Sequence, residues 1–260
     1  MSVDWQLRDS GPTDADRTVL LLPGGMGSSR SYAEVMAEPS LVSVRLVAVT
    51  MPGHAGAPPP DDYSVANYAR LTAGLAQEIG ADVVVGFSMG ASVALEMAAT
   101  GQFTGPTVLL GISLSPPDEP AFFRALIRLG DVLGTLPATV LTKAVPSMVK
   151  KVPVSEQRKA ELREDFAKNV PAHMRRALRE YLKWLKNPES HAERLCRSGV
   201  PTWVVHAEKG DGGLTPDERA TLEGCPSVRL VTIPGSVMLL PNEVPGRLAE
   251  VIGEALASLN

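Results

Sequence analysis

The segment at residues 83–92 constrains the fold more than any other part of the sequence. Three consecutive valines lead into a Gly-x-Ser-x-Gly motif at residues 86–90, and a run of small and apolar residues follows. The valines predict a buried strand and the following run predicts a helix, so Ser88 must lie on a sharp strand-to-helix turn. Gly86 and Gly90 have no Cβ and leave room for neighbouring backbone, so the turn can expose the Ser88 hydroxyl.

Short apolar runs alternate with helical patterns along most of the chain. The runs predict strands at residues 18–22, 45–50, 82–87, 106–114, 202–206 and 228–233, with Trp5 and Leu7 on a first edge strand. Their near-continuous apolar character is typical of a parallel sheet covered on both faces. Helical spacing follows Ser64 as far as Gly80 and recurs in the last 17 residues. The alternation predicts an α/β fold with a mostly parallel, doubly wound sheet flanked by helices.

One long segment interrupts this alternation. Residues 115–198 show helical patterns and no strand, so we predict a helical cap there and a core formed by residues 1–114 and 199–260. Residues 150–197 contain thirteen Lys or Arg and seven Asp or Glu. A basic stripe lies beside the apolar stripe of one predicted helix, at Arg175, Arg179, Lys183 and Lys186. A solvated helix face explains the stripe, and attraction of an anionic substrate is the alternative.

Composition excludes several classes of protein. The 260 residues are 44% hydrophobic, which fits one globular domain with an insertion and excludes disorder. The net charge of −4 argues against a nucleic-acid partner. No apolar run is long enough to span a bilayer, and the polar N-terminus does not resemble a signal peptide, so a cytoplasmic location is expected. The sequence has no phosphate loop, dinucleotide fingerprint or metal-ligand spacing, so no cofactor is expected.

Three motifs together resemble those of the α/β-hydrolase superfamily, over nearly the whole chain. The first is the Gly-x-Ser-x-Gly turn at residues 86–90. The second, Leu-Leu-Pro-Gly-Gly-Met-Gly-Ser-Ser at residues 21–29, resembles the His-Gly oxyanion loop, without its usual histidine. The third, Met-Pro-Gly-His-Ala-Gly at residues 51–56, resembles the Asp-x-Pro-Gly-His-Gly loop. The resemblance implies that Ser88 is a nucleophile and that the amide of Met89, with that of Gly25 or Met26, forms an oxyanion hole.

The resemblance also implies a catalytic acid after the strand at residues 202–206. The following loop resembles the Gly-x-x-Asp-x-x-x-Pro turn of the superfamily with one extra residue, which favours Asp211 over Glu208. The alternative is that Asp211 caps the next helix. The base should follow the last strand, but no histidine occurs after His206, and Ser236 or Val237 fills the position. This sequence therefore does not support the usual triad in the usual order.

The chain contains four histidines. His206, on a core strand, and His54, in the third motif, are the candidate substitute bases, and a structural role is the alternative for each. His173 and His191 fall in the predicted cap, where a solvated role is expected. Loss of the base costs a serine protease on the order of 10⁶ in turnover, so a standard relay is not expected here.

Three functions remain open from the sequence. The first is a hydrolase of a small ester, lactone or thioester, with Ser88 as nucleophile. The second is a non-hydrolytic enzyme that performs lyase-type or cyclase-type carbonyl chemistry on the same scaffold. The third is a ligand-binding protein with an inactive site. Apolar residues of the predicted cap such as Phe122, Phe123 and Leu126 suggest a pocket for an apolar carbonyl ligand. Packing of amphipathic helices on the core is the alternative, and it is the more common explanation for most of these residues.

Overall fold

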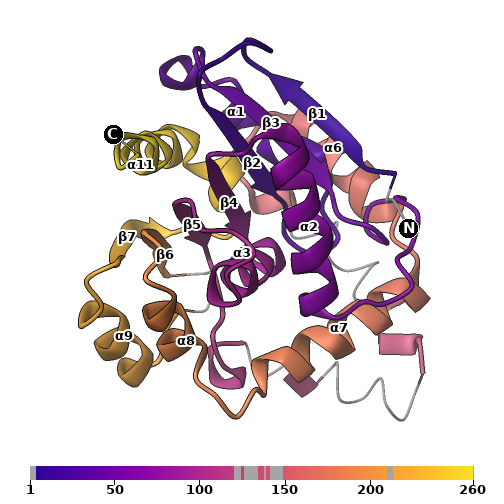
Figure 1. The fold of residues 1–260 in the computed structure, drawn as a ribbon. Helices are drawn as coiled ribbons and strands as arrows, with labels where there is room; N and C mark the ends of the chain where they lie inside the picture. Colours follow the sequence, from indigo (N-terminus) through magenta and orange to yellow (C-terminus); the bar gives the residue numbers. More distant parts are fainter. Residues whose placement is uncertain are drawn as a thin grey trace.

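A computed structural model describes residues 4–119, 124–125, 134–137, 139–140, 149–209 and 213–259. Seven strands in these ranges form one sheet in the order β1-β3-β2-β4-β5-β6-β7. β1 runs antiparallel to β3, and the other neighbours are parallel, which confirms the mostly parallel sheet (Figure 1). The strands are β1 (Gln6–Ser10), β2 (Thr18–Leu22), β3 (Arg45–Thr50), β4 (Val83–Phe87), β5 (Thr107–Leu110), β6 (Thr202–Lys209) and β7 (Val228–Ser236).

The predicted strand boundaries are correct where the apolar run is bounded by polar residues or turns. β2 and β3 have the predicted ends. β5 is shorter than predicted, because Gly111 has a φ of +54° and turns the chain away from the sheet. β6 and β7 are longer than predicted, and their pairing continues past a register shift between Ala207 and Lys209.

Helices cover both faces of the sheet. The helices are α1 (Ala33–Met36), α2 (Val65–Ile79), α3 (Met89–Ala99), α6 (Glu156–Ala167), α7 (Pro171–Leu185), α8 (His191–Ser198), α9 (Pro216–Glu223), α10 (Leu240–Glu243) and α11 (Pro245–Ala257), with short 3-10 turns at Ser29–Tyr32, Pro39–Leu41, Pro116–Asp118 and Val149–Lys151. α2, α3 and α8 pack in one buried cluster, and α1 and α11 pack in the cluster on the opposite face (Figure 1). This arrangement is the predicted doubly wound sheet.

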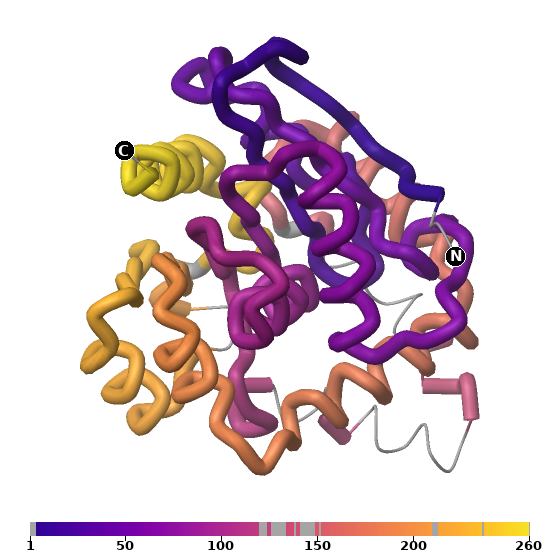
Figure 2. Tube along the Cα trace, viewed as in Figure 1, coloured from indigo at the N-terminus to yellow at the C-terminus, as the bar shows by residue number. Residues whose placement is uncertain are grey.

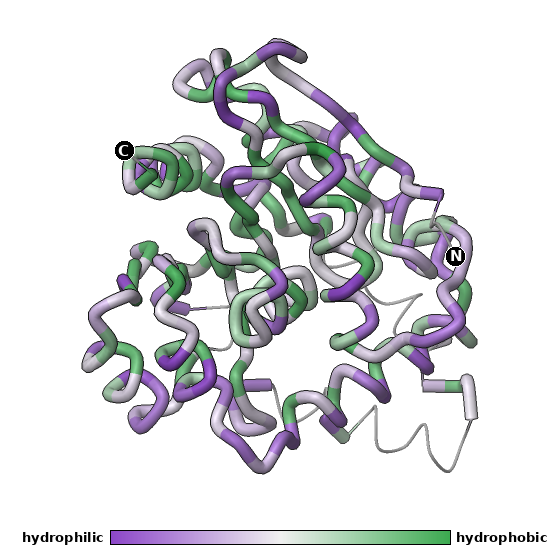
Figure 3. Tube along the Cα trace, viewed as in Figure 1, coloured by the Kyte–Doolittle hydropathy of each residue, from purple (hydrophilic) through white to green (hydrophobic). Residues whose placement is uncertain are grey.

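The side chains of the strands alternate between these two clusters. In β2, Leu20 and Leu22 contact the α2–α3 layer, whereas Val19 and Leu21 contact the α1–α11 layer. All four are fully buried, and the strand segments at the centre of Figure 3 are largely hydrophobic in colour. Both faces must therefore be covered by helices, which explains the apolar runs in the sequence.

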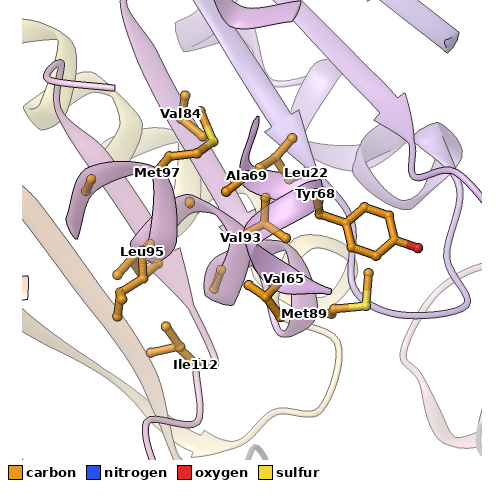
Figure 4. Packing of buried hydrophobic residues seen from close by; sticks show 14 of the residues in the cluster. Leu22, Val65, Tyr68, Ala69, Val84, Met89, Val93, Leu95, Met97 and Ile112 are labelled. Atoms are coloured by element: carbon orange, nitrogen blue, oxygen red, sulfur yellow. The ribbon is translucent and has the colours of Figure 1, made fainter. Parts of the chain in front are cut away.

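α2 shows how local signals place one covering helix. The Ser64 side chain accepts a hydrogen bond from the Asn67 amide, and Gly80 ends the helix in the left-handed conformation. The apolar stripe that begins at Val65 and Tyr68 faces the core beside Met89 (Figure 4). Both ends of α2 agree with the prediction.

The described residues between β5 and β6 form helices and turns but no strand. α7 runs along one edge of the molecule, and α8 packs on α3 in the cluster that covers the sheet (Figure 1). Glu96 of α3 and Arg194 of α8 form a bidentate ion pair at 2.8 and 2.9 Å. The cap boundaries at residues 115 and 198 stay a prediction, with α8 belonging by its packing to the layer on the sheet.

Gly90→Ala should destabilise the fold, because a Cβ at residue 90 would lie 2.4 Å from the Leu22 carbonyl oxygen and 2.6 Å from that of Pro23. We expect a loss of about 2–3 kcal/mol or more in the free energy of unfolding, measured in urea. Gly74→Ala is the matched control, because a Cβ at that exposed helical site meets nothing within 4 Å. It should gain roughly 0.5–1 kcal/mol. Equal effects of the two substitutions would contradict the crowding at Gly90.

Candidate active site

Ser88 lies on the turn between β4 and α3, as predicted. Its backbone has φ +50° and ψ −114°, a conformation that costs a non-glycine residue on the order of 1–3 kcal/mol. The Ser88 amide donates to the Leu110 carbonyl at 2.8 Å, which ties the turn to β5. A Cβ at Gly86 would lie 2.3 Å from the Gly90 carbonyl oxygen, so the two motif glycines permit this turn. The half-buried Ser88 side chain is held at the carboxyl end of the sheet.

The predicted oxyanion loop lies against this turn. A Cβ at Gly24 would be 3.5 Å from Ser88 Cβ, and a Cβ at Gly25 would be 3.8 Å from Met89 Cβ. The Gly27 amide donates to the Gly24 carbonyl at 3.1 Å and closes a tight turn. In the described part of the chain, neither the Gly25 nor the Met89 amide donates a hydrogen bond. The structure thus brings these two predicted donors together beside Ser88.

Met26, the other predicted oxyanion donor, is engaged elsewhere. Its φ is +70°, and its amide donates to Nδ1 of His54 at 3.0 Å. A backbone N–H that already makes a buried hydrogen bond is not oriented toward a substrate beside Ser88. This geometry favours Gly25 over Met26 as the candidate donor, and the choice between them stays a prediction.

His54 is a neutral support of this loop. The residue is 2% exposed, and burial lowers the pKa of its imidazole to about 4, with the nearby His173 acting in the same direction. Nδ1 accepts from Met26, and Nε2 lies 3.5 Å from the Tyr68 hydroxyl. Because both ring nitrogens have partners other than Ser88, this geometry does not favour His54 as the base.

His206 lies on β6, and β5 separates it from Ser88. Phe87, Leu110 and Val205 form a row across β4, β5 and β6, and Ser88 and His206 each follow that row by one residue. Two strand spacings amount to ~9.6 Å. A general base must lie within ~3 Å of the proton that it accepts, and this register does not by itself provide such a contact.

The remaining triad candidates are distributed over the loops that follow β6 and β7. Asp211 lies outside the described residues. Glu208 is exposed, and its carboxylate accepts from the Gly235 amide at 3.0 Å. Val237, which with Ser236 is one of the two residues predicted at the position of the usual histidine, is buried, and its amide donates to the Lys209 carbonyl. Among the described residues, none forms a hydrogen bond with the Ser88 hydroxyl.

A sequence profile of the alpha/beta hydrolase family matches residues 19–251. The chain belongs to the alpha/beta hydrolase family. The match includes the loop after β2, the Ser88 turn and the region of the predicted cap. The comparison with curated proteins gave no match.

Solved structures of the alpha/beta hydrolase fold are similar to the chain over its whole length. One is an esterase from Thermogutta terrifontis with malate bound, 19% identical with a TM-score of 0.76, covering 98% of this chain and 94% of that one. Another is the epoxide hydrolase CorEH, 16% identical with a TM-score of 0.75 and coverages of 100% and 98%. A third is an AqdC variant with its substrate, from work on ring-cleavage of the Pseudomonas quinolone signal, 18% identical with a TM-score of 0.75 and coverages of 99% and 98%. At these identities the likeness concerns the fold alone.

Two residues of the predicted cap, which the sequence analysis did not single out, lie against the predicted oxyanion loop. Asp165 of α6 accepts from the Ser28 hydroxyl at 2.5 Å and pairs with Arg30. Asn169, just after α6, donates to the Met26 carbonyl at 2.8 Å. Nothing in the local sequence around these polar residues indicates partners more than 130 residues away.

A carboxyl pair at the carboxyl ends of β5 and β6 was also missed. Asp118 accepts from the amides of Leu114 and Ser115 at 2.7 and 3.0 Å. Burial raises the pKa of Asp118 to about 6, and the Glu218 carboxylate acts in the same direction. Glu218 itself accepts from the Thr215 amide at 2.9 Å, within a capping box of α9. When two carboxyl groups share a buried site, one proton held between them is favoured over ionisation of both groups.

The predicted basic stripe borders a surface cleft that does not include Ser88. The cleft has a volume of about 770 Å³ and lies between the start of α2 and the end of α7, whose backbones pass close together in Figure 2. Arg179, Lys183 and Lys186 line it, and Lys183 lies 3.6 Å from Glu180. Phe122, Phe123 and Leu126, the apolar cap residues singled out in the sequence, are outside the described residues.

The described ranges contain neither a cluster of metal-ligand side chains nor a helix that could span a membrane. No three His, Cys, Asp or Glu side chains within them converge as ligands of a metal ion. None of the helices in the same ranges is long and apolar enough to cross a bilayer.

His54 should make stability depend on pH. Its pKa is 6.5 when unfolded and about 4 when folded, so its contribution is complete above pH 6.5 and is lost as the pH falls toward 4. We expect a fall of up to about 3 kcal/mol in the free energy of unfolding. His54→Asn keeps an acceptor for the Met26 amide but does not titrate, so urea unfolding between pH 7.5 and 4.5 should show a smaller fall.

Thr72→Ser is the control for this experiment, because Thr72 is fully buried and does not titrate. Its substitution should lower the stability by a similar amount at each pH and keep the pH dependence of the unmodified protein. Burial also lowers the pKa of His191, so part of the dependence should persist in His54→Asn. Identical pH dependence in the His54→Asn variant and the unmodified protein would show that His54 is not held neutral by the fold.

Proposed function

We propose that the chain is a hydrolase of a small carbonyl compound, an ester, lactone or thioester, with Ser88 as the nucleophile. The observation that carries the proposal is the strained Ser88 backbone next to two amides, of Gly25 and Met89, that make no other hydrogen bond in the described part of the chain. Strain of this kind persists where the surroundings enforce it, and it clusters at active sites. The match to the alpha/beta hydrolase family, which includes this turn, supports the same interpretation.

The proposed reaction begins with attack of Ser88 Oγ on the substrate carbonyl carbon. The carbonyl oxygen gains negative charge, which the amides of Gly25 and Met89 stabilise. The Met89 amide is at the N-terminus of α3, where the helix dipole adds to this stabilisation. The bond to the alcohol or thiol then breaks, and the leaving atom takes the proton that Ser88 Oγ has lost; in a lactone this alcohol stays attached through the acyl chain. Water hydrolyses the acyl-Ser88 ester to the acid and free Ser88.

The choice of substrate class follows from the missing histidine. An oxyanion hole and binding alone leave roughly 10³–10⁴ of rate over water in a serine protease that has lost its triad. Such a site turns over compounds with a good leaving group, such as thioesters and activated esters, more readily than amides. Asp211 as the acid and His206 as the base stay parts of the proposal, and substitution of each residue separately would test its role.

A non-hydrolytic carbonyl enzyme is the second candidate. The absence of a hydrogen bond to the Ser88 hydroxyl among the described residues favours it, since an unactivated hydroxyl acts as a hydrogen-bond donor to a substrate more readily than as a nucleophile. The ring-cleaving AqdC protein has a similar fold. A ligand-binding protein without turnover is the remaining alternative.

Ser88→Ala tests the proposal. The unmodified protein should be labelled by a fluorophosphonate probe and should hydrolyse p-nitrophenyl acetate, and Ser88→Ala should abolish the labelling and lower turnover at least 10²-fold, because the attacking oxygen is removed. Ser92→Ala, in the same helix and fully buried, should leave both unchanged. Mass spectrometry of the labelled peptide identifies the modified serine.

His206→Gln separates the base from the nucleophile. If His206 accepts the Ser88 proton, the labelling rate should fall at least 10-fold, because the proton acceptor is removed. Unchanged labelling would remove His206 from the mechanism. No labelling of the unmodified protein, together with no turnover, would reject the hydrolase proposal and favour ligand binding or non-hydrolytic chemistry.

A further inference from the structure

Asn169 joins the cap region to two loops of the core. It is 6% exposed and lies between α6 and α7. Its side-chain oxygen accepts from the Ala55 amide at 2.9 Å, and its side-chain nitrogen donates to the Met26 carbonyl at 2.8 Å. One amide side chain therefore bridges the oxyanion loop and the loop that contains His54.

Both loops are held at a non-glycine residue in the left-handed region. Met26 has φ +70° and Ala55 has φ +45°. Such a conformation costs roughly 1–3 kcal/mol at each residue and persists only where surrounding contacts enforce it. At Met26 the contacts are complete, because His54 accepts from the amide and Asn169 donates to the carbonyl. Loss of Asn169 would leave the Met26 carbonyl and the Ala55 amide without these buried partners.

We propose that Asn169 is a positioning residue that orients the Gly25 amide for oxyanion binding. The proposal rests on the function proposed above for Ser88. Gly25 is bonded directly to Met26 and lies within the turn closed by Gly24 and Gly27. The peptide unit that carries the Gly25 amide lies between this closed turn and Met26, whose amide and carbonyl are both hydrogen-bonded. Its orientation is therefore fixed, and Asn169 sets the direction of the Gly25 amide through Met26.

Other polar contacts keep α6 in place when Asn169 is changed. Asp165, one turn earlier, pairs with Arg30 and accepts from Ser28. Arg158, at the start of α6, donates to Glu34 at 2.6 Å. Substitution of Asn169 should therefore loosen the Met26 carbonyl without detaching the helix, which makes the variants suitable for measurement.

Asn169→Ala should slow fluorophosphonate labelling of Ser88 about 10-fold or more, and should lower kcat for p-nitrophenyl acetate by a similar factor, with KM changed less than about 3-fold. Hydrogen exchange of the Met26 amide, measured by NMR, should become faster. Asn242→Ala is the matched control, because Asn242 is equally buried and donates to the Ser31 carbonyl and to Glu34. It should lose stability but keep the labelling rate.

Asn169→Asp provides a rescue that a merely structural role would not show. The protonated carboxyl can donate to the Met26 carbonyl and accept from the Ala55 amide, whereas the ionised form has no proton to donate. Burial raises the pKa of such a carboxyl, so the protonated form should be populated in mildly acidic solution. The labelling rate of this variant, divided by that of the unmodified protein, should rise as the pH falls from 8 to 5.5. A ratio that does not change with pH would overturn the proposal.

The outcomes separate this proposal from the function on which it rests. If Ser88 reacts in the unmodified protein and Asn169→Ala labels as fast as Asn242→Ala, the positioning role is wrong and the hydrolase proposal stands. If Ser88 does not react at all, the hydrolase proposal fails, and hydrogen exchange of the Met26 amide alone tests the role of Asn169. Faster exchange in Asn169→Ala than in Asn242→Ala then supports the control of the loop by Asn169, and equal exchange rejects it.

Discussion

Close approach of backbones around Ser88 is the constraint on which the rest of the structure depends. The β4–α3 turn brings Gly86 against Gly90, and Gly90 against the carbonyl oxygens of Leu22 and Pro23 at the end of β2. No side chain fits at either glycine, so β2, β4 and α3 must meet here in one arrangement. That arrangement fixes the loop after β2 beside Ser88 and places both at the carboxyl ends of the parallel strands, where open α/β sheets bind ligands.

The sequence predicts those features that depend on short-range patterns. β2 and β3 are continuous apolar runs, the Ser88 turn is defined by glycine spacing, and the ends of α2 are marked by Ser64 and Gly80. Contacts between distant segments could not be predicted. Asn169 bonds Met26 across 143 positions, and nothing in either local sequence indicates the other. The neutrality of His54 likewise depends on burial by distant elements, which a motif does not show.

The contact between α6 and the core combines an apolar cluster, in which Met26 packs with Leu162 and Phe166, with specific polar bonds. Arg158, Asp165 and Asn169 are each less than 9% exposed, and all three bond to residues of the core. A buried polar group costs free energy when it lacks a partner, so such a contact tolerates fewer arrangements than an apolar one of equal area. The position of α6 and the conformation of the oxyanion loop are therefore linked, and displacement of α6 removes partners from both Met26 and Ser28.

The histidines now have unequal roles, and this difference limits the chemistry. His54 is buried and neutral, and its Nδ1 accepts from the Met26 amide. The unprotonated nitrogen with which a base would accept a proton is therefore occupied by the bond that holds the predicted oxyanion loop. His191 stacks on Trp184 at 3.7 Å and bonds to the Trp184 carbonyl at 2.8 Å, which gives it a structural partner as well. The predicted oxyanion donors Gly25 and Met89 lie beside Ser88, whereas the predicted position of the usual base falls on Ser236 or on the buried Val237. In the proposed reaction, such a site would lower the barrier through charge stabilisation at the carbonyl oxygen more than through proton transfer, so the leaving group of the substrate would determine how fast it reacts.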